Sequence, residues 1–306
     1  MNILVTGATG FLGSVLCREL ERQGHAVVGV CTRTCDLRRP ESLHQFNDRS
    51  FDRLFHLAAW TQAGDFCLHH SGEQWIINQQ INTNVLAWWH ERQPQAELVT
   101  IGSSCVYDPA LELSEENYLV GLPTESLFTY AMTKRMMYAG CLALRKQFGQ
   151  RFLCVVPSTL YGPDYHTDGR QMHFIFDVIR KIVRAKFLGE TVTLWGDGQQ
   201  RRELIHVEDF VRLLLRLTED CEFDLVNVGA GEEFPIRHFA ELACGLIGYD
   251  PQQIQYDTTR YVGATSKCLR IDRLKSLLPD LRLTPLEEGL KQTVNWFLAN
   301  KERFLT

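Results

Sequence analysis

Three side chains, Ser103, Tyr130 and Lys134, have the types and spacing that proton transfer at a carbonyl oxygen requires. Tyr130 and Lys134 are four residues apart in a segment with helical periodicity, so both are expected on one face of a helix. A phenol with a pKa of about 10 is a poor acid or base at neutral pH, but an adjacent ammonium lowers that pKa. Ser103, at the end of a predicted strand, is expected to hydrogen-bond the same substrate oxygen.

Three glycines, Gly7, Gly10 and Gly13, follow a short apolar run at the start of the chain. The first glycine permits a tight turn, the second admits a pyrophosphate, and the third lets helix and strand pack closely. Backbone amides and the helix dipole would then hold the phosphates. This turn is predicted to bind a dinucleotide, with Thr9, Phe11 and Leu12 between the glycines also in contact.

The end of the second predicted strand bears on the choice of cofactor. An NAD-selective protein usually has an acidic residue there, whereas this chain has Cys31 followed by Thr32, Arg33 and Thr34. Since Arg33 can pair with a 2'-phosphate, NADP(H) is favoured over NAD(H). Further cofactor contacts are predicted for residues that follow other strands or share the catalytic helix: Asp36, Leu37, Leu57, Ala58, Ala59, Tyr130, Lys134, Pro157 and Leu160.

Apolar runs alternate with helical patterns along the first half of the chain. The predicted buried strands are Asn2 to Thr6, Ala26 to Val30, Arg53 to Leu57, Glu97 to Ile101 and Phe152 to Val156. This alternation predicts an α/β fold, a Rossmann-type doubly wound parallel sheet with helices on both faces. The nucleotide is expected at the carboxyl ends of the strands.

After Pro157 the regularity breaks, and a helix from about Met172 to Ala185 is expected to begin a smaller substrate lobe. A helix at Val207 to Leu217 and a strand at Leu225 to Val228 are predicted to return to the main sheet, so this C-terminal lobe is discontinuous. The cofactor domain is then residues 1–162 plus about 203–229. The substrate lobe is about 163–202 and 230–306.

Composition describes an ordinary globular chain of 306 residues, of which 45% are hydrophobic. A net charge of -5 and a pI near 6.1 give no reason to expect nucleic acid or an anionic membrane as partner. With a first strand at Asn2 and no long apolar run, a cytoplasmic location is expected. Ten cysteines without a CxxC pair suggest neither a metal site nor a disulfide scaffold.

Nearly the whole chain resembles the extended short-chain dehydrogenase/reductase family. The resemblance is carried by Gly7-Ala8-Thr9-Gly10-Phe11-Leu12-Gly13, Phe55-His56-Leu57-Ala58-Ala59, Tyr130 with Lys134, and residues 201–209. Within that family the chain looks most like the GDP-L-fucose synthases, 3,5-epimerase/4-reductases of GDP-4-keto-6-deoxymannose. The matching segments are residues 102–107 and 157–163, His173, Trp195-Gly196-Asp197-Gly198 and Lys267.

The resemblance implies that Cys105 and His173 exchange protons at the carbons beside the ketone before hydride arrives. The chemistry is sound, because a C4 ketone acidifies the hydrogens at C3 and C5. If the strand stays extended beyond Ser103, the side chain of Cys105 is expected to enter the same cleft. His173 is expected to reach in from the other lobe.

A nucleotide-diphosphate sugar is the expected substrate. Of its ligands, Arg202 can grip a phosphate with two hydrogen bonds, whereas Lys181 is a point charge where the resembled enzymes have Arg. The predicted substrate-binding residues are Ser104, Thr159, His173, Lys181, Trp195, Arg202 and Lys267. The resemblance also implies a homodimer that uses the Tyr130 helix.

Two alternatives remain open at this point. One is a 4-keto reductase or epimerase that acts on another sugar nucleotide, of the colitose or deoxyheptose type. The other is a non-catalytic nucleotide-sensing protein on the same fold, against which the intact Ser103, Tyr130 and Lys134 argue.

Overall fold

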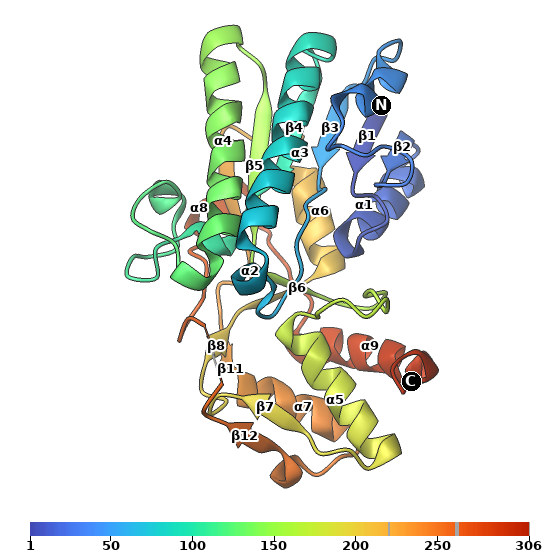
Figure 1. Cartoon of the computed structure of the whole chain (residues 1–306), viewed down its shortest axis with the longest axis vertical. Helices are drawn as coiled ribbons and strands as arrows, with labels where there is room; N and C mark the ends of the chain where they lie inside the picture. Colours follow the sequence, from blue (N-terminus) through green and yellow to red (C-terminus); the bar gives the residue numbers. More distant parts are fainter. Residues whose placement is uncertain (220, 261–262, 306) are drawn as a thin grey trace.

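A parallel sheet of six strands forms the centre of the larger lobe in this computed structural model, which describes residues 1–219, 221–260 and 263–305. The strand order is β10-β5-β4-β3-β1-β2 (Figure 1). These strands span Asn2–Thr6 (β1), Ala26–Val30 (β2), Arg53–His56 (β3), Glu97–Ile101 (β4), Phe152–Pro157 (β5) and Leu225–Val228 (β10). The predicted Rossmann-type α/β sheet is therefore confirmed, and each predicted strand agrees with the structure to within one residue.

Helices cover both faces of this sheet. Helices α3 and α4 pack against each other, and α1 packs against α6 (Figure 1). The helices are α1 (Phe11–Arg22), α2 (Phe66–His69), α3 (Ser71–Arg92), α4 (Phe128–Phe148), α5 (Phe174–Leu188), α6 (Val207–Leu217), α7 (Ile236–Ile247), α8 (Asp272–Leu277) and α9 (Leu286–Ala299).

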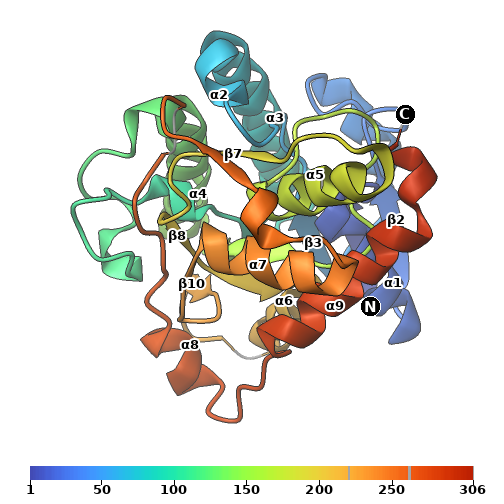
Figure 2. The same cartoon turned by 90° about the horizontal axis from the view of Figure 1, so that it is seen from below.

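The smaller lobe lies below the carboxyl ends of the strands, and α5, α7 and α9 form most of it (Figures 1 and 2). Two-stranded pairings complete the structure: β7 (Thr193–Trp195) with β12 (Gln255–Asp257), β8 (Arg201–Arg202) with β11 (Phe234–Pro235), and β6 (Thr159–Tyr161) with β9 (Leu204–His206). Helix α5 is strongly amphipathic and buries Ile175, Ile179 and Ile182 against its neighbours.

Two hydrophobic cores underlie the two lobes. The first surrounds the six-stranded sheet and includes Leu4, Phe55 and Val155, all fully buried or nearly so. The second lies among α5, α7 and α9 and includes Phe176 and Phe239. The domain boundaries predicted from sequence remain a proposal, because Leu269, Ile271 and Leu274, assigned to the substrate lobe, lie in the first core, and Tyr161, assigned to the cofactor domain, lies in the second.

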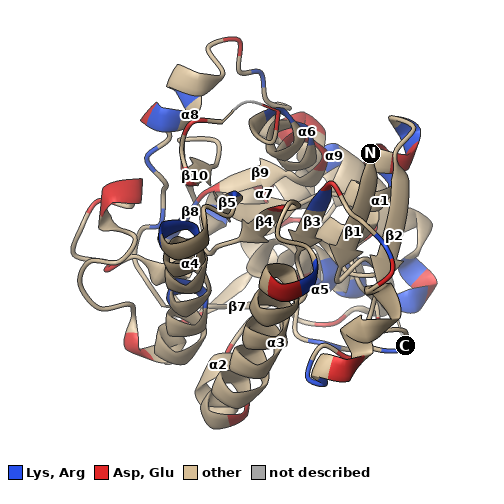
Figure 3. Ribbon diagram, turned by 90° about the horizontal axis from the view of Figure 1, so that it is seen from above, with Lys and Arg blue, Asp and Glu red and all other residues tan. Residues whose placement is uncertain are grey.

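Charge is interspersed over the view in Figure 3, where Lys and Arg alternate with Asp and Glu rather than forming a field of one sign. Many charged side chains pair locally, as Arg22 does with Glu19 and Arg38 with Asp36. Among the described residues, no helix combines the length and apolar character needed to cross a bilayer.

Candidate active site

The glycine turn has the close contacts that its spacing predicts. Gly7 has a φ of +71°, and a Cβ there would lie 2.9 Å from the backbone nitrogen of Ala58. A Cβ at Gly13 would lie 2.2 Å from the carbonyl oxygen of Gly7, so only glycine lets α1 begin against this turn. The start of α1 at Phe11 leaves backbone N–H groups directed at the turn, which suits a pyrophosphate.

Beyond β2 the chain makes a turn rich in hydrogen-bond donors. The backbone N–H groups of Arg33 and Thr34, with the side chains of both, converge on the Cys31 thiol. The Arg33 N–H contributes most to lowering the thiol pKa, which shows that the turn favours negative charge. Arg33 itself is exposed and within reach of a ligand in this turn, whereas Asp36 is bound by Arg38 through bonds of 2.8 and 2.7 Å.

The remaining predicted cofactor residues lie at the strand ends. Leu57 and Ala58 donate their backbone N–H groups to the Thr6 hydroxyl, both at 3.2 Å, which fixes the segment after β3. Pro157 ends β5 and Leu160 lies in β6. The other predicted positions are Thr9 and Ala59, which are exposed, Leu12, which is partly buried, and Leu37, which is buried.

The chain does not stay extended beyond Ser103, which was the condition for the expected placement of Cys105. Strand β4 ends at Ile101, and residues Ser104–Val106 form a single 3-10 turn. The Ser103 hydroxyl caps this turn by accepting the Cys105 N–H at 3.2 Å, because serine readily replaces a strand hydrogen bond with a local one. The turn still places the Cys105 thiol within hydrogen-bond reach of the Ser103 side chain.

Tyr130 and Lys134 lie one turn apart on α4, as predicted, but the ammonium does not act directly on the phenol. Lys134 donates to the Ile101 carbonyl at 2.8 Å, and its Nζ lies 5.8 Å from the centre of the Tyr130 ring. Burial lowers the Lys134 pKa to about 8. Burial, aided by Cys105 and Cys67, raises the pKa of Tyr130, while its hydrogen bond with Ser103 opposes that shift. The phenol is therefore protonated at neutral pH.

Cys105 is paired with a cation from a distant part of the chain. The Nζ of Lys267 lies 3.0 Å from the Cys105 sulfur. Burial alone would raise the pKa of the thiol, but Lys267, Ser103 and Arg202 together lower it below its usual value. Lys267, predicted to bind substrate, thus also stabilises a thiolate in the cleft.

His173 immediately precedes α5, in the segment that faces the larger lobe. Solvent reaches its side chain, yet the surrounding protein desolvates the imidazole. This desolvation, together with the charges of Lys267 and His166, lowers the pKa of His173. The imidazole is therefore neutral at neutral pH and lies on the Lys267 side of the cleft.

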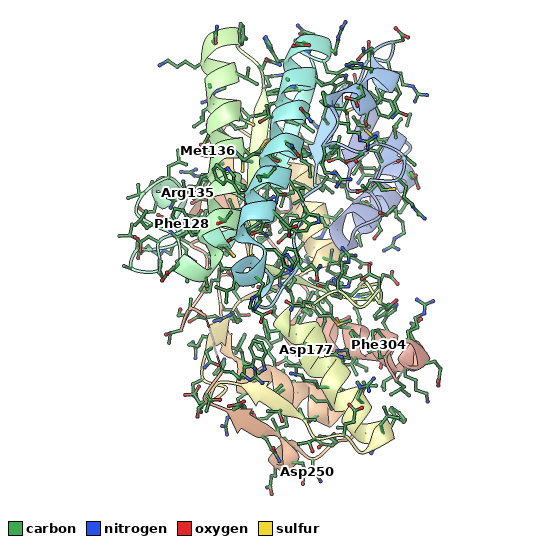
Figure 4. The ribbon with its side chains drawn as sticks, viewed as in Figure 1. Phe128, Arg135, Met136, Asp177, Asp250 and Phe304 are labelled. Carbon is green, nitrogen blue, oxygen red and sulfur yellow. The ribbon has the colours of Figure 1, made fainter. Side chains whose placement is uncertain are left out.

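The other predicted substrate residues are held in different ways. Arg202 donates to the Ala264 carbonyl at 2.7 Å and is close enough to Cys105 to influence its pKa. Lys181 instead bonds to Asp177 at 2.9 Å and to the Thr193 carbonyl at 3.0 Å, on the smaller lobe where Figure 4 labels Asp177. Trp195 is 40% exposed and stacks beneath Arg260. Ser104 lies in the 3-10 turn and Thr159 begins β6.

Sequence reasoning missed several residues that shape the cleft. Cys67, on α2, is close enough to Cys105 and Tyr130 to interact with both, and no spacing signal marks it. Glu203 accepts the N–H groups of Gly231 and Leu269 at 2.7 and 2.8 Å and so anchors the segment that carries Lys267. The sequence feature that could have identified Glu203 is its position inside the charged run of residues 201–209.

In the sequence, His56 stood out only as part of the motif at residues 55–59. In the structure it links four elements next to Lys134. Its Nδ1 lies 2.9 Å from the Thr6 hydroxyl and its Nε2 lies 3.2 Å from Asn82, which in turn donates to the Thr133 carbonyl. Burial lowers the His56 pKa to about 4, so this buried chain is neutral. It fixes β1, β3, α3 and α4 relative to one another at the site.

Comparison with known proteins identifies related enzymes over the full length. GDP-L-fucose synthase 1 of Arabidopsis thaliana is 30% identical over 305 residues, which cover 98% of this chain and 94% of that protein. The dTDP-4-dehydro-6-deoxy-D-allose reductase of a Streptomyces species is 29% identical over 325 residues, covering 98% and 97%. The fold matches a crystal structure of a GDP-L-fucose synthetase from Naegleria fowleri bound to NADP, with a TM-score of 0.89, 24% identity, and coverage of 100% and 96%.

The family comparison extends through most of the chain. The model of the NAD dependent epimerase/dehydratase family matches residues 3–229, from the first strand through β10. This range contains the glycine turn, the Ser103 turn and the Tyr130 helix. The resemblance noted from sequence is thereby confirmed, and the chain belongs to the NAD dependent epimerase/dehydratase family.

Proposed function

We propose that the protein is an NADP(H)-dependent enzyme that epimerises C3 and C5 and reduces C4 of a 4-keto-6-deoxy sugar nucleotide, in the manner of a GDP-L-fucose synthase. The single observation that carries this proposal is the Lys267–Cys105 pair, at 3.0 Å, beside the hydrogen-bonded Ser103 and Tyr130. A reductase needs the Ser103–Tyr130 group. A thiolate stabilised by a lysine can in addition act as the base when protons bound to carbon must be transferred.

The cofactor assignment rests on the glycine turn and on the donor-rich turn after β2. Gly7, Gly10 and Gly13 would hold the pyrophosphate, and the turn that contains Arg33 would hold the 2'-phosphate. When bound, the nicotinamide supplies a hydride to the C4 carbonyl carbon. The solved GDP-L-fucose synthetase from Naegleria fowleri, which is bound to NADP, agrees with this assignment.

The reduction step needs a proton at the ketone oxygen. Tyr130 carries that proton at neutral pH, because burial raises the pKa of its phenol. Ser103 shares a hydrogen bond with the phenol and can donate to the same ketone oxygen. Lys134 lies on the same face of α4, with its Nζ 5.8 Å from the centre of the Tyr130 ring, and donates to the Ile101 carbonyl.

The epimerisation step needs a base on one face of the sugar and an acid on the other. Cys105, whose thiol pKa is lowered beside Lys267, can remove a proton next to the ketone as the thiolate. His173 is neutral in the structure, but the two phosphates of a bound nucleotide would raise its pKa and allow it to return a proton. Arg202 is the best-placed guanidinium for those phosphates.

Simple reduction of another sugar nucleotide is the second candidate. It is favoured by the full-length match to a dTDP-4-dehydro-6-deoxy-D-allose reductase and by Lys181, whose ammonium is occupied by Asp177. In this case the nucleotide would be dTDP or another base. Cys105 would then have no proton to move.

Solvent deuterium separates the two candidates. The protein is incubated in heavy water with NADPH and GDP-4-keto-6-deoxymannose, and in parallel with a dTDP-4-keto-6-deoxy sugar, while nicotinamide absorbance and product deuterium are followed. We expect NADPH oxidation with deuterium at C3 and C5 of the GDP sugar. Cys105→Ser should lose the deuterium, and Gln23→Ala, which removes a distant surface bond to Glu19, should not.

The other outcomes have definite meanings. Oxidation without exchange would establish the simple reductase. Binding of NADPH without turnover of either sugar would support the non-catalytic nucleotide sensor.

We also propose that the protein forms a homodimer. Helices α3 and α4 expose Trp75, Phe128 and Met136 by 40 to 46%, and Figure 4 places the last two along α4. Such apolar exposure suits the homodimer that the family resemblance implies. A cytoplasmic location is proposed with it. Sedimentation of the wild type and of Met136→Glu tests the dimer, which the added charge should weaken.

A further inference from the structure

The loop that carries His173 reaches across to the larger lobe just before α5. At its end, Gln171 makes two hydrogen bonds to the segment that follows β3. Its backbone N–H donates to the Gln62 side chain at 3.1 Å, and its side-chain amide donates to Asp65 at 2.8 Å. His173 therefore lies two positions after a residue that joins the lobes.

The fit around Gln171 is close. A Cβ at Gly64 would lie 2.5 Å from the Gln171 side-chain oxygen, and Gly64 has a φ of +66°. The bond from Gln171 is the main reason that the pKa of Asp65 is lowered. Both observations show that the side chain of Gln171 is seated in a defined position although it is exposed.

The segment that accepts the hydrogen bonds of Gln171 continues into α2, which lies near Tyr130. Asp65 is the residue before α2, and Cys67 on α2 interacts electrostatically with Tyr130 and Cys105. The Gln171 bonds therefore connect the His173 loop to the wall that faces the proton-transfer groups.

The other end of the loop is held differently. The N–H of His173 donates to the Tyr165 hydroxyl at 3.4 Å, and the Tyr165 ring stacks on Phe176 with centroids 3.6 Å apart. This stack fixes the loop on its own lobe. Tyr165 also meets the Phe11 ring of α1 edge-on, with centroids 5.1 Å apart, so the loop has an aromatic contact with the larger lobe at this end and the polar contacts of Gln171 at the His173 end.

We propose that Gln171, bound by Gln62 and Asp65, is a positioning residue that holds His173 at the cleft for proton transfer. The inference rests on the proposed epimerase function. We call these three residues the interlobe latch. The latch acts through His173 and does not touch the reacting atoms.

A donor–acceptor exchange tests the latch. Gln171→Glu places a carboxylate opposite Asp65, whereas the double variant Gln171→Glu with Asp65→Asn restores one donor and one acceptor. Asp65→Asn alone keeps a bond, because the Gln171 amide can turn over. The readout is solvent deuterium exchange into GDP-4-keto-6-deoxymannose with NADP⁺ bound, so that no hydride is available.

We expect exchange to fall at least about tenfold in Gln171→Glu, corresponding to about 1.4 kcal/mol, and to return to within about threefold of wild type in the double variant. NADPH affinity should stay within about twofold throughout. Gln23→Ala, which removes a surface glutamine–carboxylate bond far from the cleft, is the matched control.

A second readout needs no substrate. The titration of His173 is followed by NMR in the wild type and in Gln171→Ala, with His173→Asn to identify the resonance. Withdrawal of the loop from the site should relieve the desolvation of the imidazole and separate it from Lys267, so the His173 pKa should move up toward its ordinary value.

The two readouts keep the proposals separate. If the wild type shows no exchange but Gln171→Ala moves the His173 titration, the latch stands and the proposed function fails. If Gln171→Ala leaves the titration unchanged, or the double variant is as slow as Gln171→Glu while Asp65→Asn is active, the latch is rejected.

Discussion

At the scale of single residues, the charge state of Cys105 depends on partners that are distant in sequence. Its thiol is desolvated, which by itself would keep the proton on sulfur, and Lys267 at 3.0 Å, together with Ser103 and Arg202, outweighs that penalty. Glu203 and Glu233 hold the segment around Lys267 through its backbone, which leaves the ammonium for the sulfur. A positioned cation is thus what separates this cysteine from an ordinary buried thiol.

Lys267→Met should therefore raise the pKa of Cys105, because burial remains and the attraction is lost. Since only the thiolate reacts with iodoacetamide, we expect carbamidomethylation of Cys105 at pH 7 to slow about tenfold or more, equivalent to one pKa unit. Peptide mass spectrometry across a pH series gives the midpoint for this cysteine alone. Lys186→Met, which removes a surface bond to the Gly248 carbonyl, serves as control. An unchanged midpoint in Lys267→Met would contradict the pairing.

At the scale of elements, the glycine turn depends on backbone atoms that lie too close together to leave room for a side chain. The Cβ of an alanine at residue 13 would lie 2.2 Å from the Gly7 carbonyl oxygen, and backbone on both sides cannot move without displacing β1 or α1. Gly245, in the last turn of α7, has open space around its Cβ position.

Gly13→Ala and Gly245→Ala should therefore have opposite effects. We expect Gly13→Ala to lower the free energy of unfolding by about 1–3 kcal/mol and to weaken NADPH binding. Gly245→Ala should raise the free energy of unfolding by about 0.5–1 kcal/mol through helix propensity. Urea unfolding with and without NADPH measures both. Equal effects of the two substitutions would refute the close approach at Gly13.

The elements themselves were predictable from sequence, and the contacts between them were not. Strands β1, β2 and β4 match their predicted bounds because apolar runs and turn residues act locally. The 3-10 turn after Ser103 was missed because a serine at the end of a strand can either continue the strand or cap a turn with its hydroxyl. The sequence looks the same in both cases.

Contacts between remote residues explain the other misses. Lys267 and Cys105 are 162 positions apart, and Gln171 lies 106 positions from Asp65. No periodicity relates such pairs. Family resemblance suggested that Lys267 and His173 matter, but only the folded chain shows that Lys267 faces Cys105 and which surroundings lower the pKa of His173.

At the scale of the whole molecule, the cleft requires two lobes to keep a fixed relation. Phe11, the first residue of α1 and part of the glycine turn, packs against both hydrophobic cores. Its ring meets Tyr165 and Phe176 edge-on, with centroids 5.1 and 5.5 Å apart. The cofactor turn and the loop before His173 thus share one aromatic cluster.

Phe11→Ala should consequently affect both lobes and the site between them. Loss of the ring removes buried apolar area and edge contacts, so we expect the free energy of unfolding to fall by about 2 kcal/mol. We also expect the added stability from saturating NADPH to shrink, because the glycine turn loses its support from the smaller lobe. Thermal unfolding with and without NADPH measures both effects. Phe187→Ala, which removes a half-exposed ring that contacts Lys301, should change neither by more than about 0.5 kcal/mol. If Phe11→Ala were destabilising yet gained as much from NADPH as the wild type, the cofactor turn would be independent of the smaller lobe, and closure of the cleft would depend on the interlobe latch.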